Sequence, residues 1–213
     1  MSQISPKKAY IFRITHIDNV PWLLENGIHC RNSDQRDPNF HEIGNPDLID
    51  KRIHRVVPIS PGGTLGDYVP FYFTYHSPML YNIKTGFGGV RQTPMSEIVF
   101  LVSSLRRFAE LNLSFVFTDR HAYLHTAQFR SDLTDLELLD WTILQKHDFR
   151  RDSNDPGKFE RYQAEALIYH SAPLSSILGI VCYSPHEEIQ LRGFLDAAGI
   201  SLKIAVRPDW YFQ

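Results

Sequence analysis

The chain has 213 residues, which fits one sizeable domain or at most two small ones. Its 43% hydrophobic and 22% charged residues match an ordinary folded, soluble domain and argue against general disorder. The net charge of −2 argues against a protein that coats nucleic acid without sequence preference, although a local basic groove stays open.

The first part of the chain predicts a strand, a helix and a long loop. Residues 10–17 (YIFRITHI) alternate enough, with β-branched and aromatic side chains, to form a strand. A short helix follows, with capping residues at its start and Gly27 at its end. Residues 31–50 are polar and contain two prolines, which indicates a long loop with a short helix in it. A loop of that length in a compact domain is often functional.

The rest of the chain predicts short strands with helices interspersed irregularly. Residues 132–146 carry leucines and an isoleucine on one helical face. Ser184 and Glu187 have capping-box spacing at the start of a second helix, which Gly199 ends. Strands are expected over residues 68–75, 97–104, 113–119, 164–170, 177–184 and 201–206. This order favours an α+β fold, and because no repeat or linker divides residues 1–213, we expect a single domain.

Targeting and membrane signals are missing from the sequence. No apolar run approaches the roughly 20 residues that a membrane helix requires. The N-terminal MSQISPKKAY lacks the apolar region of a secretory signal. Cys30 and Cys182 are alone and far apart, which is typical of a reducing compartment without structural disulfides. We therefore expect a cytoplasmic protein that does not contact membranes.

Common catalytic motifs do not occur. Residues 60–66 (SPGGTLG) have glycines but lack the Lys-Ser/Thr ending of a phosphate-binding loop. His121 and His125 are spaced for one helical face, but the glutamate of a zinc-protease motif is missing, so no metal site is expected. Glu165, in RYQAEALIYH, lies at the entrance of a predicted strand. From the residues alone, it either faces solvent or lines a cleft and acts there.

Six segments together resemble one family, and they occur in the same order over nearly the whole chain. They are ITHIDN (14–19), PGGTLGDYVPFYFTYHSPMLY (61–81), FVFTDRHA (115–122), LDW (139–141), QAEALIY (163–169) and RPDWYF (207–212). This set is similar to DarT, the DNA ADP-ribosyltransferase toxins of the DarTG toxin–antitoxin systems.

The resemblance implies a fold, a reaction and a partner. The fold is the ADP-ribosyltransferase fold, with two central β-sheets and flanking helices around an NAD cleft. The reaction transfers ADP-ribose from NAD to thymidine in single-stranded DNA and releases nicotinamide. No metal is expected, because NAD is a cosubstrate that carries its own leaving group. The partner is a DarG-like antitoxin with a macrodomain that removes the ADP-ribose from the modified DNA.

Two catalytic residues are implied. Glu165 corresponds to the family's catalytic glutamate, and a carboxylate on a strand can stabilise the positive charge that develops on the ribose. Arg52 corresponds to the catalytic arginine, counted back from Val57-Pro58, with Arg55 as the alternative assignment. An arginine here could hold a phosphate or the target base and favour loss of a proton from the base.

The implied NAD contacts lie on the first strand and in the shared block 61–81. They are Arg13, Thr15, His16, Asn19, Tyr72 and Tyr81. Family members often carry a histidine at the position of Arg13, where an arginine could pair with an NAD phosphate. The two tyrosines could stack on nicotinamide or could simply belong to the core.

The implied DNA contacts are His121, Met79 and Arg55. His121 could instead be a hydrogen-bonded turn residue, and Met79 a core residue. Loops 31–55 and 150–161 contain basic residues that could hold the phosphates of a single strand. A single strand suits the chemistry because a base within a duplex must first be flipped out.

Two alternative functions remain open from the sequence. The first is a related transferase that modifies guanine, RNA or protein. The second is a catalytically silent nucleic-acid-binding domain with the same fold. The presence of Glu165, Arg52 and His16 favours an active enzyme.

Overall fold

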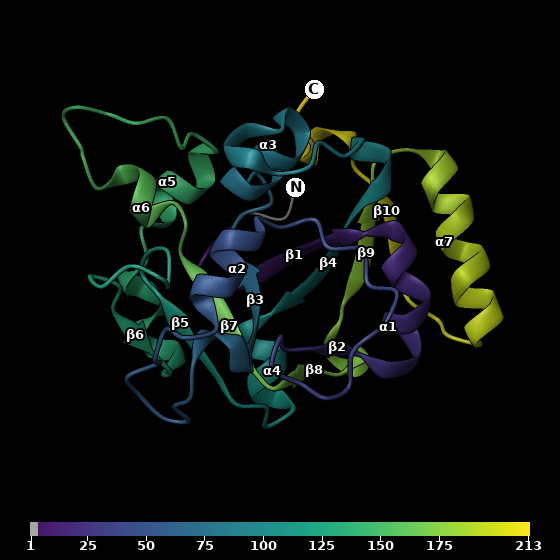
Figure 1. The fold of residues 1–213 in the computed structure, drawn as a ribbon, viewed down its shortest axis with the longest axis horizontal. Coiled ribbons are helices and arrows are strands. Elements are labelled where there is room, and N and C mark those ends of the chain that lie inside the picture. The colour runs from purple at the N-terminus through teal and green to yellow at the C-terminus, as the bar shows by residue number, and fades with distance from the viewer. Residues whose placement is uncertain (1–3) are drawn as a thin grey trace.

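The computed structural model describes residues 4–213 and is built on β-strands covered by helices (Figure 1). The strands are β1 (Tyr10–His16), β2 (Ile28–His29), β3 (Tyr68–Tyr72), β4 (Ile98–Ser104), β5 (Phe115–Thr118), β6 (Phe129–Arg130), β7 (Glu165–Tyr169), β8 (Ser171–Ala172), β9 (Gly179–Cys182) and β10 (Ile204–Val206). The α-helices are α1 (Val20–Asn26), α2 (Pro46–Arg52), α3 (Pro78–Thr85), α4 (Leu105–Glu110), α5 (Trp141–Lys146), α6 (Lys158–Arg161) and α7 (Pro185–Ala198).

The main sheet divides into two halves at its centre. Its strand order is β10-β9-β4-β1-β3-β7-β5-β6, while β2 and β8 form a separate small pair. Strand β1 pairs with β4 over its full length, from Tyr10 to His16, but with β3 only at Phe12 and Tyr72. The halves β10-β9-β4-β1 and β3-β7-β5-β6 therefore separate beyond this single point of contact. The two central sheets expected of the fold are therefore joined at this point into one eight-stranded sheet.

Both faces of the first half are covered. Along β4, Val99 and Leu101 belong to the core cluster that includes residues of α1 and α7, whereas Ile98 and Phe100 belong to the cluster that includes α3. Such alternation follows from the two-residue period of a strand, which points successive side chains to opposite faces. Figure 1 shows α1 and α7 together at one side of the sheet and α3 at another. Burial of apolar residues on both faces fixes the first half as a rigid base for the site.

The helix predicted at the C-terminal end is confirmed. Helix α7 begins after Ser184 and has a capping box, with Glu187 accepting a hydrogen bond from the Ser184 backbone N–H at 2.8 Å. It ends at Gly199, whose φ of 66° places it in the left-handed region that glycine adopts most easily.

The single helix predicted over residues 132–146 is wrong. The structure has a 3₁₀ helix over Leu133–Leu138 and then α5, which begins at Trp141. The Asp140 side chain accepts a hydrogen bond from the Ile143 N–H at 3.2 Å and so caps a new helix. The apolar spacing is helical both before and after Asp140, but this capping residue starts a new helix, so residues 132–146 form two helices instead of one.

The loop predicted over residues 31–50 is present and contains the expected short helix. Asn45 caps α2 by accepting from the Leu48 N–H at 3.1 Å, and Pro46 occupies the first turn. In Figure 1, α2 lies in front of β3 and β7, the strands of the second half nearest the centre.

None of the helices within residues 4–213 has the length and apolar character that crossing a membrane demands.

Candidate active site

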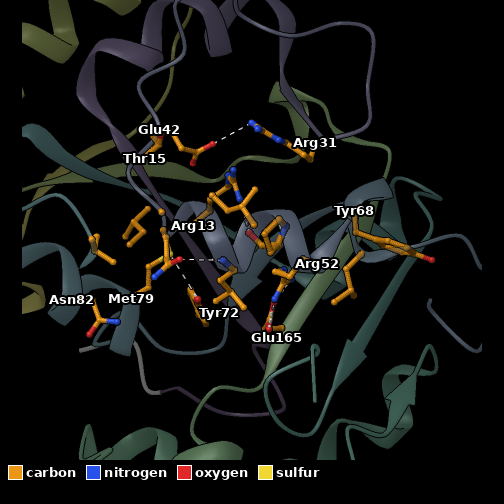
Figure 2. A pocket seen from close by; sticks show the side chains of 18 of the residues that line it. Arg13, Thr15, Arg31, Glu42, Arg52, Tyr68, Tyr72, Met79, Asn82 and Glu165 are labelled. Carbon is orange, nitrogen blue, oxygen red and sulfur yellow. Dashed lines mark hydrogen bonds and ion pairs between the residues drawn. The ribbon is translucent and has the colours of Figure 1, made fainter. Parts of the chain in front are cut away.

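A large cleft opens where the two halves of the sheet separate. Its volume is about 610 Å³, within the usual range for small-molecule sites. Its lining comes from β1, β3, β7, helices α2 and α3, and the loop between β2 and α2. Figure 2 shows the charged side chains that project into it, including Arg13, Arg52 and Glu165. The opening of the sheet therefore creates the space in which a substrate can bind.

Glu165 lies in this cleft and is almost fully removed from solvent. It is the first residue of β7, pairs with Tyr72 on β3, and is 1% exposed. The Arg52 guanidinium donates two hydrogen bonds to its carboxylate, at 3.0 Å and 2.7 Å (Figure 2). The geometry excludes the solvent-facing alternative: the carboxylate is held by a bidentate pair, the strongest common form of ionic contact.

The environment of Glu165 favours its charged form. Burial by itself would raise the pKa of Glu165, but Arg52, then His121, and hydrogen bonds from Arg52 and the Ala122 N–H outweigh burial and hold that pKa below its ordinary value. The Ala122 N–H donates to the carboxylate at 3.0 Å, and His121 Nδ1 lies 3.5 Å from it. The chain thus presents an ionised carboxylate in a site shielded from water.

Helix α2 positions Arg52 and explains why Arg55 does not take its place. Arg52 is the last residue of α2, and its side chain points into the cleft. Burial lowers its pKa, but Glu165 more than compensates, so the pKa of Arg52 is raised. Beyond the helix, Arg55 turns away and donates to the Leu124 carbonyl at 3.2 Å. The structure brings Arg52, and not Arg55, to Glu165.

The cleft walls hold most of the residues expected to contact NAD. Arg13, Thr15, Tyr72 and Tyr81 all line it. Arg13 donates to the Pro70 carbonyl at 3.0 Å, and burial lowers its pKa. Burial, followed by the nearby Glu165 charge, raises the pKa of Tyr72, so its phenol stays neutral. A buried guanidinium and aromatic rings in one cleft fit a dinucleotide, whose phosphates and rings need such partners.

His16 and Asn19 do not line the cleft. Arg13, Ile14 and Thr15 of β1 all line the cleft, whereas His16, the last residue of the strand, lines a separate groove, where its Nε2 lies 3.1 Å from a Glu97 carboxylate oxygen. Asn19 is 1% exposed and supports the site from behind. Its amide donates to Thr15 Oγ1 at 3.0 Å, so Asn19 contacts a residue of the cleft wall and does not itself line the cleft.

Asn19 also fastens the loop that covers the cleft. Its Nδ2 donates to the His41 carbonyl at 3.0 Å, and its Oδ1 accepts from the His41 N–H at 2.8 Å. This loop, residues 31–45, brings Phe40 and Glu42 into the cleft lining. Sequence reasoning missed these two residues because a loop has no periodicity from which side-chain direction can be read.

We expect Asn19→Ala to raise the KM for NAD about tenfold with little change in kcat. The two bonds to His41 stabilise the loop by about 1 kcal/mol each, and their loss leaves the reacting groups in place. Initial rates across NAD concentrations at saturating oligonucleotide measure this. The matched control is Asn26→Ala, since Asn26 is exposed and donates only to the carbonyl of Trp22. A fall in kcat at constant KM would contradict the assignment.

Some of the residues expected to contact DNA line the cleft and one does not. His121 and Met79 line the cleft, whereas Arg55 does not. Burial lowers the pKa of His121, although the charge of Glu165 opposes this shift. The segment before β7 adds further lining residues, namely Phe149, Arg150, Arg151, Phe159 and Gln163. These lie within or next to residues 150–161, which reach the cleft but are not a loop throughout, because the segment ends in helix α6 (Lys158–Arg161).

Comparison with known proteins identifies relatives that act on the same kinds of substrate for which the cleft is suited. A family model described as ssDNA thymidine ADP-ribosyltransferase, DarT, matches residues 12–212. A DNA ADP-ribosyl transferase of Escherichia coli O127:H6 is 51% identical over 212 residues, covering 100% of this chain and 97% of the relative.

Solved structures and a longer relative extend the comparison. DarT of Thermus sp. 2.9 in complex with ADP-ribosylated ssDNA superimposes with a TM-score of 0.90, at 33% identity and 100% coverage of both chains. The same protein in complex with NAD+ gives a TM-score of 0.84 at 34% identity, covering 97% of this chain and 99% of that one. A Thermosipho africanus protein named as a DNA ADP-ribosyl transferase–DNA ADP-ribosyl glycohydrolase fusion is 32% identical over 79 residues, 37% of this chain and 20% of its own length. The chain therefore belongs to the DarT family of NAD-dependent ssDNA thymidine ADP-ribosyltransferases.

Proposed function

We propose that Glu165 and Arg52 are the catalytic residues with which this chain transfers ADP-ribose from NAD to a thymine base of single-stranded DNA. One observation carries the assignment. The two side chains form a bidentate pair, with bonds of 3.0 Å and 2.7 Å, on the floor of a cleft of about 610 Å³. Residues 1–213 would act as one catalytic domain.

In this proposal Glu165 stabilises the sugar as the nicotinamide leaves. The bond between ribose C1′ and the nicotinamide nitrogen breaks, and its electron pair goes to nicotinamide. Positive charge then develops on the ribose, and a buried carboxylate on a strand stabilises it without having to reorganise. The lowered pKa of Glu165 keeps the side chain charged for this purpose.

Arg52 would act on the incoming base. A thymine nitrogen forms the new bond to C1′ and loses its proton, which leaves to solvent water, so negative charge develops on the base as the N–H bond breaks. A guanidinium beside the base stabilises that charge and makes the proton easier to lose. The arginine that holds the carboxylate in place would therefore also contact the acceptor, bringing both reacting partners to one point.

The cleft would hold the two substrates side by side, since Tyr72 contacts Met79 at 3.8 Å and the Tyr81 and Phe149 ring centroids lie 5.8 Å apart. We assign Arg13, Thr15, Tyr72 and Tyr81 to NAD, with Asn19 as a positioning residue behind them. We assign His121, Met79 and the segment 149–163 to DNA. Within that segment the Arg151 guanidinium lies 4.8 Å from the Phe159 ring centroid, an arrangement that can present both a charge and a flat ring to a strand.

The remaining expectations concern the cell. We propose that a DarG-like macrodomain antitoxin removes the mark and that the chain works in the cytoplasm. The name of the Thermosipho africanus relative supports the first part, because it joins a transferase to a glycohydrolase. The two widely separated free cysteines support the second.

Isotope-labelled NAD and matched oligonucleotides test the proposed reaction. We expect label on a single-stranded oligonucleotide that contains one thymine, and none on the same strand with cytosine in its place. Mass spectrometry should show one ADP-ribose per modified strand. Label on thymine-free DNA, on RNA or on protein would reject the acceptor assignment. If wild type and Glu165→Ala both failed to transfer label, the silent binding domain would be favoured.

A further inference from the structure

A second groove lies on the other side of the loop that covers the cleft. Residues Phe40 and Glu42 of that loop line both the cleft and this groove. Among its described lining residues are four carboxylates (Asp18, Glu42, Glu97 and Glu187), three histidines (His16, His41 and His186) and one arginine (Arg91). An excess of carboxylates and imidazoles does not suit a nucleic acid backbone, but it suits a divalent cation.

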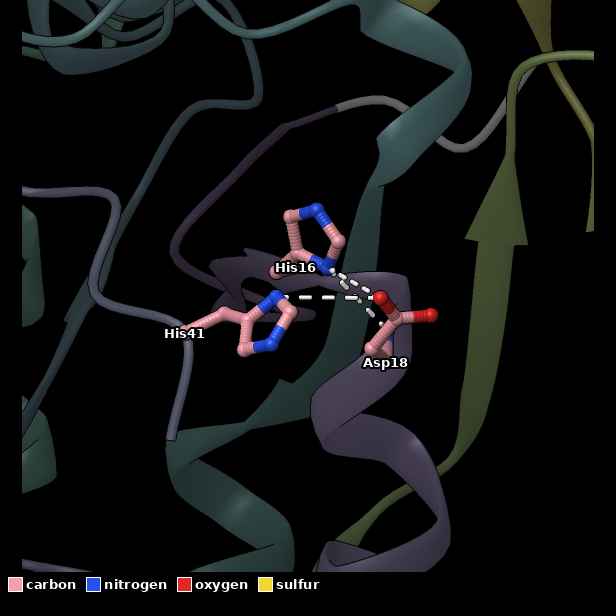
Figure 3. A group of neighbouring side chains, drawn as sticks. All are labelled: His16, Asp18 and His41. Carbon is pink, nitrogen blue, oxygen red and sulfur yellow. Dashed lines mark hydrogen bonds and ion pairs between the residues drawn. The ribbon is translucent and has the colours of Figure 1, made fainter. Parts of the chain in front are cut away.

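Three of these side chains converge on one point (Figure 3). His16 Nδ1 lies 3.5 Å from an Asp18 carboxylate oxygen, and His41 Nδ1 lies 3.6 Å from the same oxygen. All three ligand atoms fall within 4.8 Å of one another. Zinc bonds of about 2.0 Å separate neighbouring ligand atoms of a tetrahedral site by about 3.3 Å, so small side-chain adjustments would complete the geometry.

A second, independent feature is the hydrogen bond on the far side of the His16 ring. Its Nε2 lies 3.1 Å from a Glu97 carboxylate oxygen, which places the ring proton on Nε2. The Nδ1 lone pair then faces Asp18 and His41 and accepts only a 3.2 Å contact from the Asp18 N–H. A carboxylate behind an imidazole is the arrangement that orients metal-binding histidines and raises their basicity. His16 is also 8% exposed, so its ring is held by packing.

We propose that His16, Asp18 and His41 bind a divalent transition-metal ion, best matched by zinc, that fastens the loop 31–45 to β1. His16 ends β1, Asp18 follows it, and His41 belongs to the loop. The ion would replace the long N–H contact to His16 Nδ1 and add to the two bonds that Asn19 makes with the His41 backbone. Water would occupy the fourth position. Because the ion would lie outside the cleft, the transfer reaction itself does not pass through it.

The consequence is a link between metal and NAD binding. The loop contributes Phe40 and Glu42 to the cleft, so an ion that restrains His41 restrains the wall next to the dinucleotide. A loop that is already ordered costs less to order when the ligand binds. Zinc should therefore slow hydrogen exchange at the His41 amide.

Zinc titration of the full chain, with any purification histidines removed, tests the site. A chromophoric chelator serves as the competitor. We expect a single zinc ion per chain, with affinity reduced at least about tenfold in His41→Ala and in Asp18→Asn. Glu97→Gln should weaken binding by about tenfold as well, since Glu97 only orients His16. His54→Ala is the matched control, because His54 is an exposed histidine outside the groove. The zinc affinity of this variant should equal that of wild type.

Two further measurements make the result decisive. Cobalt in place of zinc should give the visible absorption of a four-coordinate ion, and His41→Ala should abolish it. Hydrogen exchange with and without zinc should show protection at residues 39–43 in wild type only. Equal zinc affinity in wild type and His41→Ala, or no binding at all, would overturn the site. Binding without protection of the loop would overturn its role in fastening.

Discussion

Glu165→Gln should lower the rate of thymidine modification by about 10²–10³ while leaving NAD affinity within a few-fold of wild type. That is the range lost when one preorganised electrostatic partner of a transition state is removed. Glutamine has nearly the same shape, and its carbonyl oxygen can still accept hydrogen bonds from Arg52 Nη1 and from the Ala122 N–H, whereas the second bond, from Arg52 Nη2, is lost. The substitution therefore removes the negative charge that the cationic sugar needs and preserves the packing around a side chain that is 1% exposed.

Single-turnover rates with saturating NAD and a one-thymine oligonucleotide measure this effect, and NAD titration measures binding separately. Glu110→Gln is the control, because Glu110 on α4 is largely exposed and its side chain forms an ion pair with Arg107 alone among residues 4–213, at 3.5 Å. It should retain the wild-type rate. A Glu165→Gln enzyme within tenfold of wild type would show that the charge of Glu165 does not act on the sugar. Loss of NAD affinity with an unchanged rate at saturation would instead place Glu165 among the binding residues.

The sequence located the strand that carries Glu165 but could not orient the side chain. Residues Glu165 to Ile168 are all buried, so both faces of β7 are covered and no alternation of polar and apolar residues marks the cleft side. The direction of Glu165 follows from its pairing with Tyr72 on β3 and from the arrival of Arg52. Both partners are distant along the chain, and only the family resemblance pointed to them.

The choice between Arg52 and Arg55 illustrates a second limit. They are three positions apart, so on a continuous helix both would lie on the same side. Helix α2 ends at Arg52, and the turn that follows directs Arg55 to the Leu124 carbonyl. A helix end can shift by a residue or two in a sequence-based prediction, which is enough to exchange the two roles.

Composition predicts a loop over residues 31–50, but it does not predict the contacts that its first part, residues 31–45, makes. The pairing of its His41 with Asn19, and the approach of His41 to His16 and Asp18, join residues more than twenty positions apart through a loop without periodicity. Similarly, His16 and Thr15 are neighbours in sequence, yet Thr15 lines the cleft and His16 lines the separate groove. Local patterns supplied the strands, whereas tertiary contacts decided which side chains meet.

Arg52→Ala should destabilise the fold by about 3–5 kcal/mol near neutral pH, because it leaves the buried Glu165 charge without its partner. In wild type the pKa of Glu165 lies below its ordinary value of 4.5, so the carboxylate contributes stability that is fully present above pH 4.5 and is lost as the pH falls through the folded-state pKa. Without the guanidinium, burial becomes the dominant influence and raises the pKa of Glu165 above 4.5.

The sign of the pH effect is therefore reversed in the variant. Its folded state keeps a proton on Glu165 that the unfolded state has already released, so its stability falls as the pH rises above 4.5. The slope reaches about 1.4 kcal/mol per pH unit until the raised folded-state pKa is passed. The difference in unfolding free energy between wild type and Arg52→Ala should be smaller at about pH 5 than at about pH 7.5, as urea denaturation can measure.

The double variant Arg52→Ala/Glu165→Gln isolates the cause. It lacks the titrating carboxylate, so its stability relative to wild type should vary less with pH over this range, and at neutral pH it should be more stable than Arg52→Ala alone. That recovery would mean that the arginine is needed mainly to hold an otherwise unfavourable buried charge, which is the charge the reaction uses. If Arg52→Ala were destabilised equally at both pH values, or if removing the carboxylate gave no recovery, the pair would not be electrostatically coupled. The proposal that Arg52 holds Glu165 in its charged form, and that this charge stabilises the ribose, would then be wrong as well.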